Sequence, residues 1–152
     1  MIAIGCDHGG FALKQEIIKY LNDNHIAFKD FGTDSEASVN YAPIAAAVGH
    51  SVANGECEKG ILICGTGIGM SMAVNKVKGI RAACCSDHFS AKYTRLHNDA
   101  NILCMGGRSS VPAWRWNWWI CSSTPHSRAA DIRSELTRLP PSRTESFNCH
   151  YE

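Results

Sequence analysis

The sequence predicts an α/β fold, a three-layered Rossmann-like arrangement in which helices cover both faces of a parallel sheet of about five strands. Short apolar runs alternate with amphipathic segments along the first hundred or so residues, and this rhythm is typical of right-handed βαβ units. The run GILIC at 60–64 is continuously apolar, as expected of a parallel strand buried on both faces. A chain of 152 residues is long enough for one domain with a substantial core.

The individual elements follow from the pattern in chain order. Residues 1–6, MIAIGC, are predicted to form the first strand, and DHGG a loop. From Phe11 to about Asn24 apolar residues recur at helical spacing, with Lys14, Glu16 and Lys19 on the other side. The remaining predicted elements are a strand at 27–32, a helix at 44–54, the strand at 60–64, a helix near 69–77, a strand at 80–85, a helix near 88–97 and a strand at 101–107.

Composition excludes several classes of protein. Hydrophobic residues make up 45% of the chain and the formal net charge is +1, as in an ordinary globular protein. There is no basic excess that would suggest nucleic-acid binding, and no apolar run of about 18 residues that would suggest a membrane span. The first residues do not resemble a signal peptide, so we expect a cytoplasmic location. The eight cysteines lack CxxC spacing, which favours neither a zinc site nor a disulfide framework.

Polar loops follow four of the predicted strands. Ligands of parallel α/β sheets bind beyond the carboxyl ends of the strands, so we expect a site where these loops meet. The loops contain Asp7 with His8, Cys64 with the glycine-rich stretch after it, Ser86 with Asp87, and residues 106–108.

The stretch CGTGIG at 64–69 is the most informative of these loops. Its three glycines allow a sharp turn and leave backbone N–H groups uncovered before a helix, an arrangement that suits a phosphate, a carboxylate or an enediolate oxygen. A turn that needs glycine only for its dihedral angles is an equally good interpretation of this motif alone. The stretch matches neither the dinucleotide fingerprint GxGxxG nor a Walker motif with its lysine.

Cys64 and His97 are the candidate reactive residues. Beside a helix N-terminus we expect a thiolate to be favoured and its pKa lowered, as a nucleophile or general base requires. A buried structural cysteine is the alternative interpretation. His97 lies just before the last predicted strand and could reach the same face, although a lone histidine is more often a surface residue. The thiol, the imidazole, the anion cradle and the Asp7–His8 pair together favour a catalytic site.

Three segments, GCDHGGFALK, GILICGTGIGMSMAVNKVKGIRAA and RLHNDANILCMGGR, resemble the ribose-5-phosphate isomerase B group and its galactose-6-phosphate isomerase relatives. The resemblance covers residues 1–108. It implies interconversion of an aldose phosphate and a ketose phosphate through a cis-enediolate, without metal or cofactor. It also implies a site at the interface of a homodimer, with a tetramer as the alternative. The sequence does not separate ribose 5-phosphate from galactose 6-phosphate or allose 6-phosphate as substrate.

The resemblance also implies roles for single residues. Cys64 would move the proton between C1 and C2, and His97 would assist opening of the furanose ring. Such a step needs a placed base and preorganised donors because a carbon acid beside a carbonyl is weak. Thr66 and the N–H groups of Gly65, Gly67, Ile68 and Gly69 would hold the developing oxyanion, Asp7, His8 and Asn98 would contact sugar oxygens, Tyr41 would lie against the sugar ring, and Arg108 would bind phosphate.

The resemblance stops after Arg108. The group continues with a long amphipathic helix and two arginines that hold the phosphate, whereas residues 109–152 form an atypical tail with four tryptophans. Tryptophan has the single codon TGG. In a reading frame shifted back by one base, each of these codons is replaced by one that ends in TG, which encodes Leu, Val or Met. In that frame residues 109–137 can be recoded very nearly as the group's tail, with both arginines. We interpret the tail as the result of a single-base deletion at the Arg108 codon.

The altered tail keeps a second class of function open. A protein that binds sugar phosphate without turning it over is the alternative to an enzyme, and a redox role of Cys64 is a third interpretation.

Overall fold

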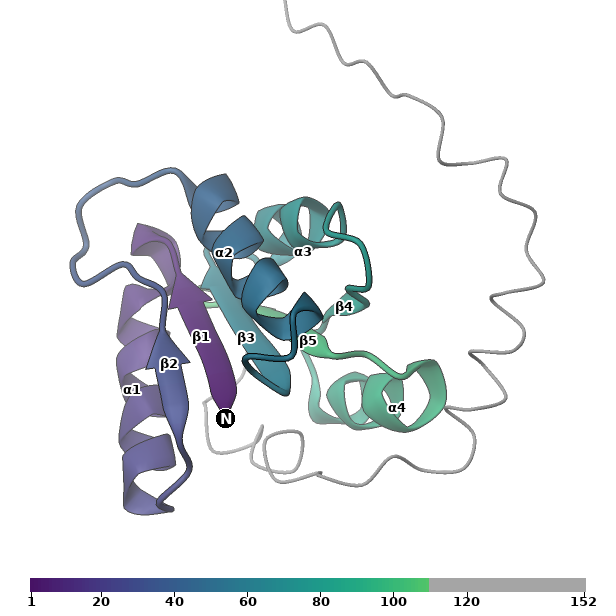
Figure 1. Cartoon of the computed structure of the whole chain (residues 1–152). Coiled ribbons are helices and arrows are strands. Elements are labelled where there is room, and N and C mark those ends of the chain that lie inside the picture. The colour runs from purple at the N-terminus through teal and green to yellow at the C-terminus, as the bar shows by residue number, and fades with distance from the viewer. Residues whose placement is uncertain (110–152) are drawn as a thin grey trace, which may run out of the picture.

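The computed structural model describes residues 1–109, which fold into three layers with a five-stranded sheet between two layers of helices (Figure 1). The strand order is β2-β1-β3-β5-β4, and every neighbouring pair is parallel. The predicted fold class is therefore confirmed. The atypical tail proposed for residues 109–152 lies, apart from its first residue, outside the described residues.

Each predicted element is present, with small differences at its ends. α2 begins at Tyr41 rather than at residue 44, because the Asn40 side chain accepts the N–H of Ala42 at 3.0 Å and caps the helix. Pro43 falls in the first turn, where proline is tolerated. The elements in chain order are β1 (Ile2–Cys6), the 3-10 helix η1 (His8–Gly10), α1 (Phe11–Asp23), β2 (Phe28–Asp30), α2 (Tyr41–Ala53), β3 (Lys59–Cys64), α3 (Ile68–Val74), β4 (Ala82–Cys84), α4 (His88–Asn98) and β5 (Ile102–Gly106).

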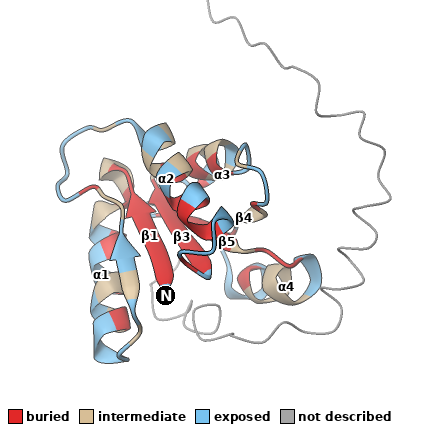
Figure 2. Ribbon diagram, in the orientation of Figure 1, coloured by how far each residue is buried: buried red, intermediate tan, exposed pale blue. Residues whose placement is uncertain are grey.

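An apolar core lies on each side of the sheet. One core joins α1 and α4 to the sheet through residues such as Ile17, Ala91 and Ile63. The other joins α2 and α3 to it through residues such as Val48 and Met70. Because β3 contributes alternate side chains to both cores, all of its residues are buried (Figure 2). This confirms the prediction of a central strand buried on both faces.

Lys14 is buried, although the sequence predicts it on the polar side of α1. Its side chain is 1% exposed, and its Nζ donates to the Asp30 carboxylate at 2.7 Å and to the Thr33 carbonyl at 2.5 Å. The helical period assigns Lys14 to the polar side, but its long side chain reaches the end of β2 and finds two oxygens there. The buried ammonium thus fastens α1 to the segment that leads from β2 to α2.

The strand order creates a crevice at the carboxyl ends of β1 and β3. The chain leaves β1 toward β2 at one edge of the sheet, and it leaves β3 toward β4 at the other edge. Ligands of open α/β sheets bind where connections diverge in this way. The loop that begins at Asp7 and the loop that begins at Gly65 both leave the sheet at these ends, where the polar loops predict a site. No helix within residues 1–109 has the length and apolar character to span a membrane.

Candidate active site

Cys64 ends β3, and the loop after it folds around its sulfur. The side chain is 6% exposed, and Sγ accepts a hydrogen bond from the Gly67 N–H at 3.0 Å. Gly67 has φ +82°, a left-handed conformation that glycine adopts without strain. This turn brings residues 65–67 back over the thiol and starts α3 at Ile68.

Part of the predicted anion cradle is already engaged within the chain. The Gly67 N–H donates to sulfur, and the Ile68 N–H donates to Thr66 Oγ1 at 3.3 Å. The main-chain carbonyls of Cys64 and Gly65 accept from the segment after β5, at 2.7 Å from Gly107 and at 3.1 Å from Arg108. An anion at this loop would therefore share the N–H donors of Gly67 and Ile68 with their present acceptors, Cys64 Sγ and Thr66 Oγ1, or displace those acceptors, while the loop itself stays tied to β5.

Asp7 and His8 lie on the other side of the crevice. The Asp7 side chain is 7% exposed, and its carboxylate accepts the Gly9 N–H at 2.8 Å. The Nδ1 of His8 accepts the Val39 N–H at 3.4 Å, so a neutral imidazole carries its proton on Nε2. A methyl group at Gly9 would lie 2.9 Å from the Gly65 nitrogen. The two loops therefore touch.

Tyr41 and Arg108, two further predicted site residues, lie beside the glycine loop. The ring of Tyr41 lies over Gly69, where an added methyl group would be 3.2 Å from the ring. The Arg108 side chain lies beside Gly65, with its Cδ 3.9 Å from the position of an added methyl group there. A cavity of about 330 Å³ lies beside Arg108 and is lined by His8, Gly9, Ala12, Glu36, Gly107 and Arg108. Its lining is polar and carries the cationic Arg108 together with the acidic Glu36.

Glu36 is a lining residue that the sequence did not predict. It belongs to the segment between β2 and α2, and the sequence pattern around it is that of an ordinary polar loop. Its place in the cavity depends on contacts such as that between Val39 and His8, which are distant in the sequence.

His97 and Asn98 do not join this site within one chain. α4 follows β4 and returns toward the start of β5, so its last residues lie at the end of the sheet where the strands begin. There the Asn98 carbonyl accepts a hydrogen bond from Arg81 Nε at 2.8 Å. Cys64 lies at the opposite end, where the strands finish, and the strands between the two ends are about 16 Å long. The expectation that His97 reaches the same face as Cys64 is therefore wrong for a single chain.

Other thiols near Cys64 remain protonated at neutral pH. Partial burial, and after it the nearby Cys64, raises the pKa of the exposed Cys84, whose Sγ lies 3.7 Å from the Thr66 carbonyl. Burial raises the pKa of Cys85 to about 11 and that of Cys104 well above its usual range. The six cysteines within residues 1–109 are free, and this part of the chain contains no cluster of three or more metal-ligating side chains.

The chain is similar to known sugar-phosphate isomerases. A family model described as Ribose/Galactose Isomerase matches residues 2–118. Ribose-5-phosphate isomerase B of Escherichia coli is 50% identical over 107 residues, which are 70% of this chain and 72% of that protein. D-erythrulose-4-phosphate isomerase of Pectobacterium atrosepticum is 40% identical over 112 residues, which are 73% of this chain and 74% of that protein.

A solved structure agrees with the fold. The ribose-5-phosphate isomerase B of Clostridium thermocellum superposes with a TM-score of 0.82 at 42% identity, and the match covers 89% of this chain and 93% of that one.

Proposed function

Because the chain belongs to the ribose/galactose isomerase family, we propose that it interconverts ribose 5-phosphate and ribulose 5-phosphate with Cys64 as the base. The observation that supports this proposal most strongly is the place of Cys64. Its sulfur lies at the end of the central strand, under a glycine turn and beside the strand that leads to Asp7. A carbon acid beside a carbonyl needs a base and oxyanion donors placed together in this manner.

Each group of the crevice has a part in the proposed reaction. The Cys64 thiolate takes the proton from C2 and returns it to C1, while Thr66 and the loop N–H groups stabilise the enediolate oxygen. The loops after β1 and β3 hold the sugar hydroxyls, and Tyr41 lies against the sugar chain. Arg108 binds the phosphate, and this remote contact supplies binding energy that orients the reacting carbons.

We also propose that His97 and Asn98 reach the site from a second copy of the chain, in a homodimer. The sheet separates them from Cys64 within one chain, as described above. A site that needs both groups is therefore incomplete in a monomer. In the dimer, His97 of one copy would act on the ring oxygen of a sugar bound to the other.

Two exposed apolar surfaces support the dimer. On α4 the rings of Phe89 and Tyr93 lie 4.3 Å apart and those of Tyr93 and His97 4.9 Å apart, and Phe89 is 68% exposed. On α3, beside the glycine loop, Ile68 and Met72 are 51% and 65% exposed. Exposed apolar groups gathered at one place mark interaction surfaces. Contact between α4 of one copy and α3 of the other would bury both and bring His97 toward Cys64.

The proposed setting is the cytoplasm. Six free thiols within the described part of the chain suit a reducing compartment.

The test is ribulose 5-phosphate formation from ribose 5-phosphate by the purified full chain, with its intact mass confirmed. Cys64→Ala should lower kcat by about 10²–10⁴-fold, the usual contribution of a general base. Cys57→Ala is the matched control because that thiol lies before β3, at the far edge of the sheet. Undiminished turnover in Cys64→Ala would refute the proposed role, and a chain that is active as a monomer would refute the dimer.

A further inference from the structure

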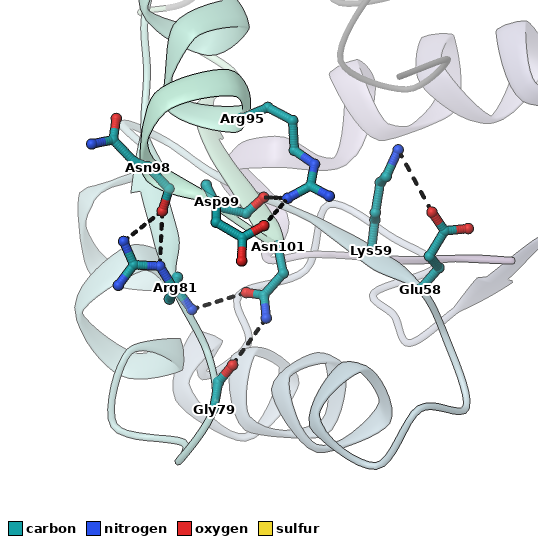
Figure 3. A network of polar contacts seen from close by, with 9 residues as sticks. Glu58, Lys59, Gly79, Arg81, Arg95, Asn98, Asp99 and Asn101 are labelled. Atoms are coloured by element: carbon teal, nitrogen blue, oxygen red, sulfur yellow. Dashed lines mark hydrogen bonds and ion pairs between the residues drawn. The ribbon is translucent and has the colours of Figure 1, made fainter. Parts of the chain in front are cut away.

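Arg81 lies just before β4, and its guanidinium fastens the end of α4 (Figure 3). Its Nε donates to the main-chain carbonyl of Asn98 at 2.8 Å, and Nη2 donates to the same oxygen. Asn98 is the last residue of α4, and the last carbonyls of a helix have no partner within it. A cation at this place also opposes the negative end of the helix dipole.

Arg81 is itself held by Asn101, which precedes β5. The Arg81 N–H donates to Asn101 Oδ1 at 2.9 Å, and the Asn101 N–H donates to the Arg81 carbonyl at 3.0 Å. Asn101 Nδ2 also donates to the Gly79 carbonyl at 2.9 Å. The guanidinium therefore extends from a backbone whose N–H and carbonyl are both held by Asn101 (Figure 3).

An ion pair between Arg95 and Asp99 shapes the turn after α4. Arg95 Nη1 donates to the Asp99 carboxylate at 2.7 Å and to the Ala100 carbonyl at 3.2 Å. Asp99 is 6% exposed and has φ 50°, a left-handed conformation that few residues other than glycine adopt. These contacts hold the left-handed conformation of Asp99, and this conformation sets the path of the backbone after α4.

The position of α4 depends on these contacts of Arg81 and Arg95 because the helix contributes little to the core. Ala91 is its buried residue, while His97 and Asn98 are exposed. The core therefore does not fix the direction of the last turn of the helix, and the contacts of Arg81 and Arg95 do.

We propose that Arg81 is a positioning residue for His97 in opening of the substrate's furanose ring. By holding the Asn98 carbonyl, its guanidinium sets the last turn of α4, so that the His97 imidazole meets the ring oxygen of a sugar bound to the second copy. This inference rests on the proposed function and deepens it. It separates two steps of the reaction: ring opening depends on Arg81, and proton transfer at Cys64 does not.

The two steps can be separated with two substrates. A four-carbon aldose 4-phosphate cannot close a furanose ring, because its O4 carries the phosphate, and its isomerisation needs no ring opening. Arg81→Lys keeps the charge but lacks the forked donors of the guanidinium. We expect the full-length variant to lose about 10–100-fold in kcat/KM with ribose 5-phosphate, as misplaced catalytic groups do. With erythrose 4-phosphate we expect a smaller loss, because there the variant disturbs only the contact of Asn98 with a sugar oxygen.

An isotope effect gives a second readout. When ring opening limits the rate, the effect of deuterium at C2 of ribose 5-phosphate on kcat/KM falls toward one, whereas a smaller fraction of folded enzyme leaves it unchanged. Lys78→Ala is the matched control, since it removes an exposed cation from the segment that precedes Arg81, and it should change neither readout.

Equal losses on both substrates, with an unchanged isotope effect, would overturn the inference, because Arg81 would then support the fold in general. If the chain accepts ribose 5-phosphate alone, the isotope effect decides whether Arg81 acts on ring opening.

If the chain accepts neither sugar, the proposed function fails for this chain. The His97 signals in NMR spectra then decide whether Arg81 positions His97. The Tyr93 ring, 4.9 Å away, should shift these signals in the native chain. Arg81→Lys should abolish that shift and Lys78→Ala should preserve it; a preserved shift in Arg81→Lys would overturn the inference.

Discussion

Gly67 packs directly against Met105, so that a methyl group on Gly67 would lie 2.8 Å from the main chain of Met105. On its other side the same methyl group would lie 3.0 Å from the Cys84 sulfur. The glycine loop is thus pressed onto the end of β5 at the place where it folds around the Cys64 thiol. With φ +82° in addition, this position accepts no side chain without movement of the loop.

Gly67→Ala should therefore lower the free energy of unfolding by about 2–4 kcal/mol, which combines left-handed strain with overpacking. It should also abolish isomerisation, because the loop moves away from Cys64. Gly65→Ala is the control, since its methyl group would meet the Arg108 side chain at an ordinary 3.9 Å. Urea unfolding of both variants measures the difference, and equal stabilities would contradict the packing described for this loop.

Lys14→Met should destabilise the chain by roughly 1–3 kcal/mol, because it leaves the Thr33 carbonyl without its donor and Asp30 without its cation. Asp30 is one-third exposed, which keeps the cost below that of a fully buried pair. Lys19→Met, on the exposed side of α1, should have little effect. Urea midpoints of the two variants test this, and a Lys14→Met chain as stable as the parent would show that the buried ammonium is dispensable.

Asp87 should make the stability of the chain depend on pH in the acidic range. Its carboxylate accepts the Ser90 N–H at 2.8 Å at the start of α4, and this hydrogen bond lowers the pKa of the carboxyl. A carboxyl whose pKa is lower in the folded state stabilises the fold above its unfolded pKa of about 3.9. That contribution is lost as the pH falls through the folded pKa.

The comparison of Asp87→Asn with its parent measures this contribution. Asparagine still caps the helix but does not ionise, so the parent should be more stable near neutral pH. The difference should shrink as the pH falls below the unfolded pKa of about 3.9 and vanish below the folded pKa. Asp34→Asn, in the exposed loop after β2, is the control. A difference between parent and Asp87→Asn that stays constant with pH would contradict the role of the ionised cap.

The sequence could predict the order of the elements because their periodicity is local. The run at 60–64 is apolar at every position because β3 contributes to the cores on both faces. The glycine loop could be located for the same reason, since its conformation is set by the residues within it. α2 starts three residues before the predicted start at 44, because the Asn40 side chain caps the helix and Pro43 lies inside its first turn.

Long-range placement could not be read from the sequence. Lys14 has the spacing of a surface lysine, and its burial depends on Asp30 and the Thr33 carbonyl, which belong to another element. His97 lies close to the last strand in sequence, but it lies at that strand's beginning rather than at its end. Which edge of the sheet a residue occupies follows from the direction of its element, and for His97 the consequence is that one chain does not complete the proposed site.

Restoring the reading frame after Arg108 should raise activity. If residues 109–152 result from a single-base deletion, as the tryptophan codons indicate, the chain has lost two phosphate-binding arginines of its group and retains Arg108. Two charge-assisted contacts contribute about 1.5–3 kcal/mol each, so kcat/KM for ribose 5-phosphate should rise at least about 100-fold in a chain with the restored tail.

The contribution of the restored arginines can be separated from that of the restored helix. A restored tail in which methionine replaces both arginines keeps the apolar surface of the helix but cannot bind phosphate. If kcat/KM rises with the arginines and not with the methionines, phosphate binding is what the present chain lacks. An equal rise with both tails would assign the defect to packing of the helix instead. DNA sequence across the Arg108 codon tests the premise itself: an uninterrupted frame there would mean that the tryptophan-rich tail is native to this protein, and the predicted gain would lose its basis.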